Sequence, residues 1–269
     1  MNHTQVSIEA TEEQQEILIA VLSELEAVGF EQTENTLIAY FDENNFPSYD
    51  VSAALDGYTF YTTTIAEKNW NAEWESNFEP VIVDDFCAVR AHFHQPIKGV
   101  QHDILITPKM SFGTGHHATT YMMMQQMREL DFMGKSVFDF GTGTGVLAIL
   151  AEKLGAAAVL AIDNDKWSIE NGNENAANNN CKRVEMVLQD VVPSGQAFDI
   201  ILANINRNVI LHFISDLKKA VVPGGFILFS GLLIADENDI VEACSQQALQ
   251  LVKQTQKSGW ISILFVNSI

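Results

Sequence analysis

Residues 136–145 read Ser-Val-Phe-Asp-Phe-Gly-Thr-Gly-Thr-Gly, an apolar strand pattern that leads directly into a turn with three glycines. The next stretch, VLAILAEKLG, has the composition of a buried helix. A glycine turn between a strand and a helix lets the backbone approach a ligand closely and directs amide groups at it. The dinucleotide fingerprint G-x-G-x-x-G requires a glycine where this chain has Val146. The turn therefore predicts a ligand-binding edge that is not the pyrophosphate turn of a dinucleotide enzyme.

Apolar runs and helix-length segments alternate from residue 136 to residue 231. The strand-like runs are SVFDF, AVLAI, VEMVL, FDIILA and GFILFSG. Nearly continuous apolar strands separated by helices predict a parallel sheet covered on both faces. A helix at residues 236–247 follows, and then the runs LQLVKQT and WISILFV, joined by Lys-Ser-Gly, predict a terminal hairpin. We expect a doubly wound α/β domain.

Polar residues stand where three further strands of this sheet end. Asp163 closes the second strand, Asp190 follows the third and Asn204 follows the fourth. Ligands of such sheets bind beyond the carboxyl ends of the strands, and a carboxylate at the position of Asp163 can accept hydrogen bonds from both hydroxyls of a ribose. The alternative is that each of these residues only caps a helix or a turn, which for Asp190 is an equally good interpretation.

The first part of the chain has a different character. Residues 1–66 contain strand patterns at 4–9, 36–41 and 58–64 and, after the first of them, one helix with a Thr11–Gln14 capping box, which we expect to end at Gly29. Residues 67–80 carry Trp70, Trp74 and Phe78 at intervals of four, which predicts a linker helix. We therefore expect an N-terminal α+β domain at 1–66, a linker helix at 67–80 and the larger domain at 81–269.

Charge restricts the possible partners. The 269 residues have 35 acidic and 15 basic side chains, a formal net charge of −20. Residues 1–69 hold 13 of the acidic side chains and a single basic one, for a net charge of −12. This field opposes direct nucleic-acid binding and suits a basic protein partner, although a solvated acidic surface is an equally simple interpretation.

Cysteine, histidine, methionine and asparagine also bear on the possible chemistry. The cysteines at 87, 181 and 244 form no C-x-x-C pair, and the N-terminus lacks a signal-peptide pattern, so a reduced cytoplasmic setting without a membrane is expected. The seven histidines have no metal-binding spacing, and we predict no metal site. Methionines 122, 123, 124 and 127 predict core packing, whereas the asparagines between 171 and 180 predict a solvated surface.

The segment upstream of the glycine turn makes the interpretation specific. Residues 108–120 read PKMSFGTGHHATT, and this stretch resembles the F-G-T-G-x-H-x-T-T motif of the ribosomal protein L11 methyltransferase family. The acidic residue and G-x-G-x-G at 139–145 resemble motif I of class I methyltransferases. W-N-x-x-W at 70–74 and L-A-N-I at 202–205 extend the similarity over nearly the whole chain. Lys109 and Ser111 depart from the residues common in the family.

The resemblance implies a seven-stranded class I methyltransferase domain with S-adenosylmethionine as its cofactor. It implies that Thr120, Gly141, Gly143, Asp163 and Asn204 contact the cofactor, and that Phe112 lies in a loop near it. The expected reaction is methylation, up to trimethylation, of α- and ε-amino groups of a basic large-subunit ribosomal protein that is free before assembly. Asn204 is our candidate for orienting the amine, and no residue is expected to act as a dedicated base. We expect a monomer.

Other functions are compatible with parts of this pattern. A nucleotide-dependent oxidoreductase shares the fold and Asp163 but lacks the glycine at position 146. A ribosome-assembly binding protein without catalysis could keep the same fold. Methylation of RNA is disfavoured by the charge, and methylation of glutamine by the sequence Asn-Ile-Asn-Arg at 204–207, which differs from the N-P-P-Y pattern of glutamine methyltransferases.

Overall fold

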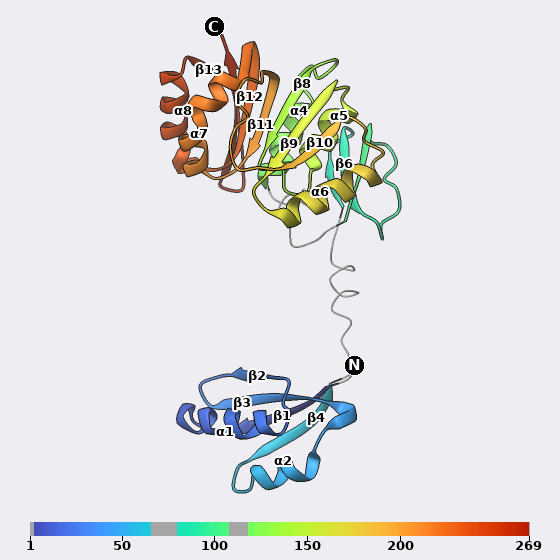
Figure 1. Ribbon diagram of the computed structural model, residues 1–269, viewed down its shortest axis with the longest axis vertical. Coiled ribbons are helices and arrows are strands. Elements are labelled where there is room, and N and C mark those ends of the chain that lie inside the picture. Colours follow the sequence, from blue (N-terminus) through green and yellow to red (C-terminus); the bar gives the residue numbers. More distant parts are fainter. Residues whose placement is uncertain (1–2, 66–79, 108–117, 269) are drawn as a thin grey trace. The chain divides into compact units, whose positions relative to one another are not determined.

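The computed structural model describes residues 3–65, 80–107 and 118–268 (Figure 1). Contacts between Cα atoms divide the chain into two compact units, Met1–Asn77 and Phe78–Ile269. Residues 67–79 of the linker helix predicted at 67–80, and Phe112 of the motif, lie outside the described residues. Within the described ranges, no helix is long and apolar enough to span a membrane.

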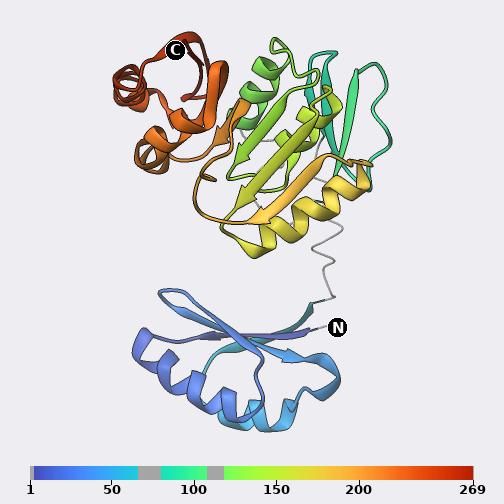
Figure 2. The same cartoon turned by 45° about the horizontal axis from the view of Figure 1, so that its top comes forward.

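The first unit is a four-stranded antiparallel sheet with two helices on one face, as Figure 2 shows. Its elements are β1 (His3–Glu9), α1 (Glu12–Glu24), β2 (Gly29–Gln32), β3 (Thr36–Asp42), η1 (Glu43–Asn45), α2 (Ser48–Ala54) and β4 (Phe60–Ile65), and the strand order is β2-β3-β1-β4. Alternate residues of β1 and β3 face the helices and form the core with Leu18, Leu22 and Val51. The α+β composition predicted for this part is confirmed.

The end of the first helix was predicted wrongly. Helix α1 begins as expected after Thr11, whose backbone N–H donates to the Gln14 side chain at 2.9 Å, but it ends at Glu24. Glu26 takes the left-handed backbone conformation, with φ of 66°, and Gly29 instead begins β2. The strand β2 and the short helix α2 were not foreseen, because four to seven residues carry too little periodicity to predict an element.

The second unit is built on a seven-stranded sheet in the order β10-β9-β8-β11-β12-β14-β13. Its strands are β8 (Ser136–Phe140), β9 (Ala158–Asp163), β10 (Val184–Leu188), β11 (Phe198–Asn204), β12 (Val221–Leu233), β13 (Leu249–Lys257) and β14 (Trp260–Asn267). The first five of these strands run parallel, and β14 is antiparallel to both of its neighbours. The doubly wound seven-stranded domain and the terminal hairpin through Ser258 and Gly259 are confirmed.

Helices cover both faces of this sheet (Figures 1 and 2). The helices are α4 (Ala118–Met127), α5 (Val146–Lys153), α6 (Lys166–Asn178), α7 (Arg207–Ala220) and α8 (Glu237–Gln246). One core packs α4, α5 and part of α6 against one face, and a second core packs α7 and α8 against the other. The four methionines of α4 are buried, so the prediction that they fill the core is confirmed.

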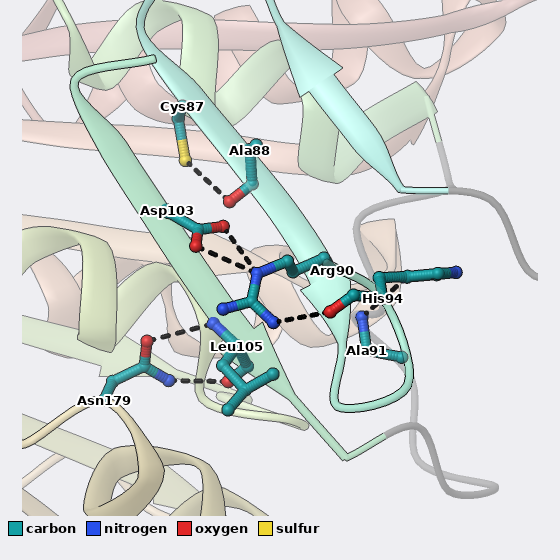
Figure 3. A network of polar contacts seen from close by, with 8 residues as sticks. All are labelled: Cys87, Ala88, Arg90, Ala91, His94, Asp103, Leu105 and Asn179. Atoms are coloured by element: carbon teal, nitrogen blue, oxygen red, sulfur yellow. Dashed lines mark hydrogen bonds and ion pairs between the residues drawn. The ribbon is translucent and has the colours of Figure 1, made fainter. Parts of the chain in front are cut away.

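A smaller three-stranded sheet packs on the first of these cores. It consists of β5 (Val81–Val83), β6 (Cys87–Ala91) and β7 (His102–Ile106) in that order, with β6 and β7 parallel. Arg90 of β6 forms an ion pair with Asp103 of β7 at 2.9 Å and donates to the His94 carbonyl oxygen (Figure 3). The strands at 81–83 and 103–106 were predicted, and β6 was not.

Candidate functional site

A cavity of about 680 Å³ opens at the carboxyl ends of the parallel strands. This is the edge at which doubly wound sheets bind their ligands, and the volume suits a small-molecule site. All five residues predicted to bind the cofactor line it, together with Asp190; the five are Thr120, Gly141, Gly143, Asp163 and Asn204. The fold therefore brings together residues that are up to 84 positions apart in the sequence.

The glycine turn forms the floor of the cavity between β8 and α5. Gly141 and Gly145 have φ of 75° and 79°, a region that favours glycine over other residues. A Cβ atom on Gly141 would collide with the Ile205 side chain, and one on Gly145 would lie 2.6 Å from the Met186 methyl group. The turn thus needs glycine both for its conformation and for its close packing against β10 and the segment after β11.

Asp163 closes β9 and faces the cavity beside this turn. Its Oδ2 accepts a hydrogen bond from the Gly143 backbone N–H at 2.9 Å, and its Oδ1 accepts one from the Asp165 backbone N–H at 3.0 Å. Each carboxylate oxygen has two lone pairs, so both keep accepting capacity for the hydroxyls of a ribose. The backbone contacts fix the direction of the carboxylate and also join the glycine turn to the end of β9.

Asp139, near the end of β8, is the acidic residue of motif I, and the sequence assigned it no role. Burial raises the pKa of Asp139 to about 7, although the Thr142 hydroxyl, which donates to Oδ2 at 2.6 Å, lowers it. The nearby Asp163 carboxylate adds to the rise in the pKa. Because Asp139 is buried and accepts a hydrogen bond from Thr142 of the glycine turn, the charge next to this turn changes when Asp139 gains or loses its proton near neutral pH.

Asn204 and Thr120 meet on the opposite wall of the cavity. Asn204 ends β11, Thr120 lies in α4 with 0% of its surface exposed, and the Asn204 Nδ2 donates to the Thr120 Oγ1 at 3.1 Å. The Asn204 Oδ1 is buried and has no hydrogen-bond partner among the described residues. Buried polar atoms normally have partners. An acceptor that is aligned by its own amide group and lacks a partner in the described part of the chain is suited to an N–H or O–H group of a ligand that reaches it.

The charge of the lining decides what kind of ligand fits. Asp163, Asp165 and Asp190 line the cavity, and no lysine or arginine is among its lining residues in the described part of the chain. A pyrophosphate group would meet three carboxylates and no side-chain cation there. A nucleoside that carries a positive sulfonium, held at its ribose by Asp163, is compatible with the same lining. The arrangement therefore fits S-adenosylmethionine better than a dinucleotide.

Two helices, α6 and α7, begin at the cavity, and the residue just before each helix caps it. The Asp165 side chain accepts from the backbone N–H groups of Trp167 and Ser168 and so caps α6, and the Ser168 hydrogen bond lowers the pKa of Asp165. The Asn206 side chain caps α7 by accepting from the Val209 N–H at 3.1 Å. Both caps line the cavity. Neither residue was predicted to belong to the site, and only the fold shows that they border it.

One interpretation of the sequence was only partly right. Asn173, Asn178 and Asn180 are exposed, as predicted, but Asn171 and Asn175 are 0% exposed and bond to the backbone of other elements. Their spacing of four, continued at Asn179, was the signal that one polar helix face is buried. Among the described residues no cluster of three or more histidine, cysteine or acidic side chains could hold a metal ion.

Comparisons with known proteins all indicate one family. Residues 2–268 match the sequence profile of the family described as Ribosomal protein L11 methyltransferase (PrmA). The relative of that name from Porphyromonas gingivalis is 37% identical over 260 residues, covering 93% of this chain and 90% of its own length. The one from Chlorobaculum tepidum is 36% identical over 279 residues, covering 98% and 96%.

The crystal structure of ribosomal protein L11 methylase from Lactobacillus delbrueckii subsp. bulgaricus superposes with a TM-score of 0.67 at 28% identity. It covers 71% of this chain and 100% of its own chain. The family profile, the relatives and this structure all agree with the resemblance that the motifs at 112–120 and 139–145 indicated. This chain belongs to the ribosomal protein L11 methyltransferase family.

Proposed function

We propose that this protein transfers methyl groups from S-adenosylmethionine to α- and ε-amino groups of ribosomal protein L11, up to the trimethylated state. Membership of a family of S-adenosylmethionine-dependent methyltransferases supports the reaction class and the cofactor. The observation that favours amine methylation most directly is the buried Oδ1 of Asn204, which lacks a partner among the described residues and belongs to a residue that lines a cavity with three aspartates.

The chain's own residues divide the work of holding the cofactor. The backbone of Gly141 and Gly143, which lines the cavity, would lie against the cofactor, and the Asp163 carboxylate would accept hydrogen bonds from its ribose hydroxyls. When bound, the cofactor supplies a methyl group that its sulfonium already makes electrophilic. The protein therefore needs to provide position and a neutral amine, and proximity is the main contribution that it can make.

The amine must lose its proton before it can attack. For a lysine with a reference pKa of about 10.4, this costs about 4.6 kcal/mol at pH 7, whereas a terminal amine at about 8 costs about 1.4 kcal/mol. Removal from water disfavours the ammonium form, so an enclosed cavity lowers this cost without a dedicated base. In the first two transfers the Asn204 Oδ1 would accept one N–H of the neutral amine and so orient its lone pair. The neutral dimethylated amine has no N–H, so the third transfer would not use this contact.

The charge distribution supports a basic protein as substrate. The net charge of −12 on residues 1–69 favours association with a basic ribosomal protein and opposes contact with RNA phosphates. The first unit is thus our candidate for substrate recognition, and the free protein before ribosome assembly is the preferred target. We further infer that the enzyme acts as a monomer in the cytoplasm.

A direct test combines the purified full-length protein, free ribosomal protein L11 and labelled S-adenosylmethionine, followed by mass spectrometry of the product. Stepwise mass increases, one for each added methyl group, are expected at defined amino groups. Asn204→Ala should lower the transfer rate by about tenfold or more, and Asn173→Ala, an asparagine whose side chain donates to the Ile169 carbonyl of its own helix, serves as the matched control. Cofactor binding without transfer to any protein would instead favour a binding protein that has lost catalysis.

A further inference from the structure

Three asparagines at intervals of four along α6 and its C-terminal end bind the free edge of β7, and we call Asn171, Asn175 and Asn179 the asparagine ladder. Asn179 accepts from the Leu105 N–H at 3.0 Å and donates to the Leu105 carbonyl oxygen at 2.6 Å (Figure 3). Thr107 lies two residues after Leu105, directly after the end of β7. Asn175 accepts from the Thr107 N–H at 2.7 Å, and Asn171 donates to the Thr107 carbonyl oxygen at 3.1 Å.

The geometry of the two elements explains this match. Four residues of α-helix rise about 6 Å, and two residues of a strand rise about 6.6 Å. The N–H and C=O groups of alternate strand residues point to the same edge, so side chains at i and i+4 of a helix can meet them one after another. The ladder thus satisfies an edge of β7 that no strand of the described sheet covers.

Asn175 differs from Asn179 in one respect. Its Nδ2 donates to the Thr144 carbonyl oxygen at 2.9 Å, inside the glycine turn, while its Oδ1 accepts from the Thr107 N–H. Both Asn175 and Thr144 are fully buried. In this way one side chain connects the end of β7 with the turn on the cavity floor, whereas the Nδ2 of Asn179 donates to the carbonyl oxygens of Leu105 and Asn175.

We propose that Asn175 is a positioning residue for the cofactor. By bonding both to the end of β7 and to the glycine turn, Asn175 fixes the distance between them and so sets the affinity for S-adenosylmethionine. The inference rests on the proposed function, because it takes that cofactor as the ligand of the cavity. Gly172, one turn before Asn175 in α6, packs against the same glycine turn, and a Cβ atom added to it would lie 3.5 Å from the Gly143 carbonyl oxygen. This is ordinary van der Waals contact, and a Cβ atom on Gly145 would likewise lie 3.4 Å from the Gly172 Cα, so the helix and the turn are in contact here. Asn175→Ala removes one hydrogen bond from the buried Thr144 carbonyl at this contact.

The test compares Asn175→Ala with Asn179→Ala in the full-length protein, using isothermal titration calorimetry with S-adenosylmethionine. Both variants lose hydrogen bonds to the β7 edge and should lower the melting temperature by similar amounts. Only Asn175→Ala should raise the dissociation constant of the cofactor, by about fivefold or more, the equivalent of one net hydrogen bond. Asn179→Ala should stay within about twofold of the wild type.

Kinetics and hydrogen exchange give independent readouts. Asn175→Ala should raise KM for the cofactor while kcat at saturating cofactor changes little, and amide exchange should become faster at residues 141–146. If Asn175→Ala does not fold, Asn175→Asp keeps the acceptor for Thr107 and removes the donor to Thr144, and it should show the same weaker binding. Equal dissociation constants for the wild type and the Asn175 variants, or an equal rise in Asn179→Ala, overturn the inference. Absence of binding by the wild type would overturn the proposed function instead.

Discussion

Replacing Thr120 by valine tests whether the Asn204 amide is held in place by its partner. Valine has the shape of threonine but cannot accept the hydrogen bond from the Asn204 Nδ2, which spans 3.1 Å at a residue that is 0% exposed. A buried donor left without its partner costs about 1–3 kcal/mol. If this whole energy serves to align the Asn204 Oδ1 toward the amine, its loss slows transfer by about five- to 150-fold.

The assay is transfer of labelled methyl groups to ribosomal protein L11, with kcat measured at saturating cofactor and the dissociation constant of S-adenosylmethionine measured separately. We expect Thr120→Val to lower kcat about tenfold. Thr120→Ser keeps the hydroxyl and should retain most of the activity. The reasoning is refuted if Thr120→Val transfers methyl groups as fast as the wild type, or if the serine variant is equally slow, since the lost property would then be the shape of the side chain.

Three further predictions concern the turn, its buried acid and the thiols. Gly141→Ala should abolish cofactor binding in calorimetry, because the new methyl group collides with the Ile205 side chain. The control is Gly195→Ala, at a similar φ of 76° but with no neighbour within 4 Å; it carries the same backbone strain and should keep the affinity for the cofactor. The pKa of Asp139 is about 7 in the folded protein against an ordinary value of 3.8, so between these pH values the folded state binds one proton more than the unfolded state. In urea titrations, the free energy of unfolding of the wild type should therefore fall from about pH 4 to about pH 7 relative to that of Asp139→Asn. Parallel pH profiles of the two proteins would contradict this. Burial raises the pKa of Cys87 and of Cys244 to about 12, so neither thiol of the native protein should react with iodoacetamide at about pH 7.5. Both should react once urea unfolds the protein, and mass spectrometry of the alkylated protein measures the difference.

Much of the second unit could be predicted because its signals are local. Each parallel strand is a short apolar run, and the helices between them have the length and composition of their own element, so their order along the chain already implies a doubly wound sheet. The carboxyl ends of parallel strands share one edge, which is why Asp163 and Asn204 were expected near the glycine turn. Both residues line the cavity at that edge.

The asparagines of α6 show why such predictions fail. Their polarity and helical pattern are those of a solvent-exposed face, and a sequence does not state which backbone groups lie opposite that face. The free edge of β7, about 70 residues earlier in the chain, supplies the missing partners of Asn175 and Asn179. Asn171 and Asn175 are therefore fully buried, and Asn179 donates to Leu105 from a partly buried position.

The amino-acid sequence alone determined the order of the strands and helices around the seven-stranded sheet, the glycine turn at 141–145 and the family, because these depend on residue types at short, regular spacings. Only the tertiary structure decided which polar atoms meet: that the Asn204 amide donates to Thr120, that the Asn204 Oδ1 has no partner among the described residues, and that Asn175 joins β7 to the glycine turn. The physical reason is that the free energy of a buried polar group depends on its partner, and these partners are 31 to 84 residues away along the chain.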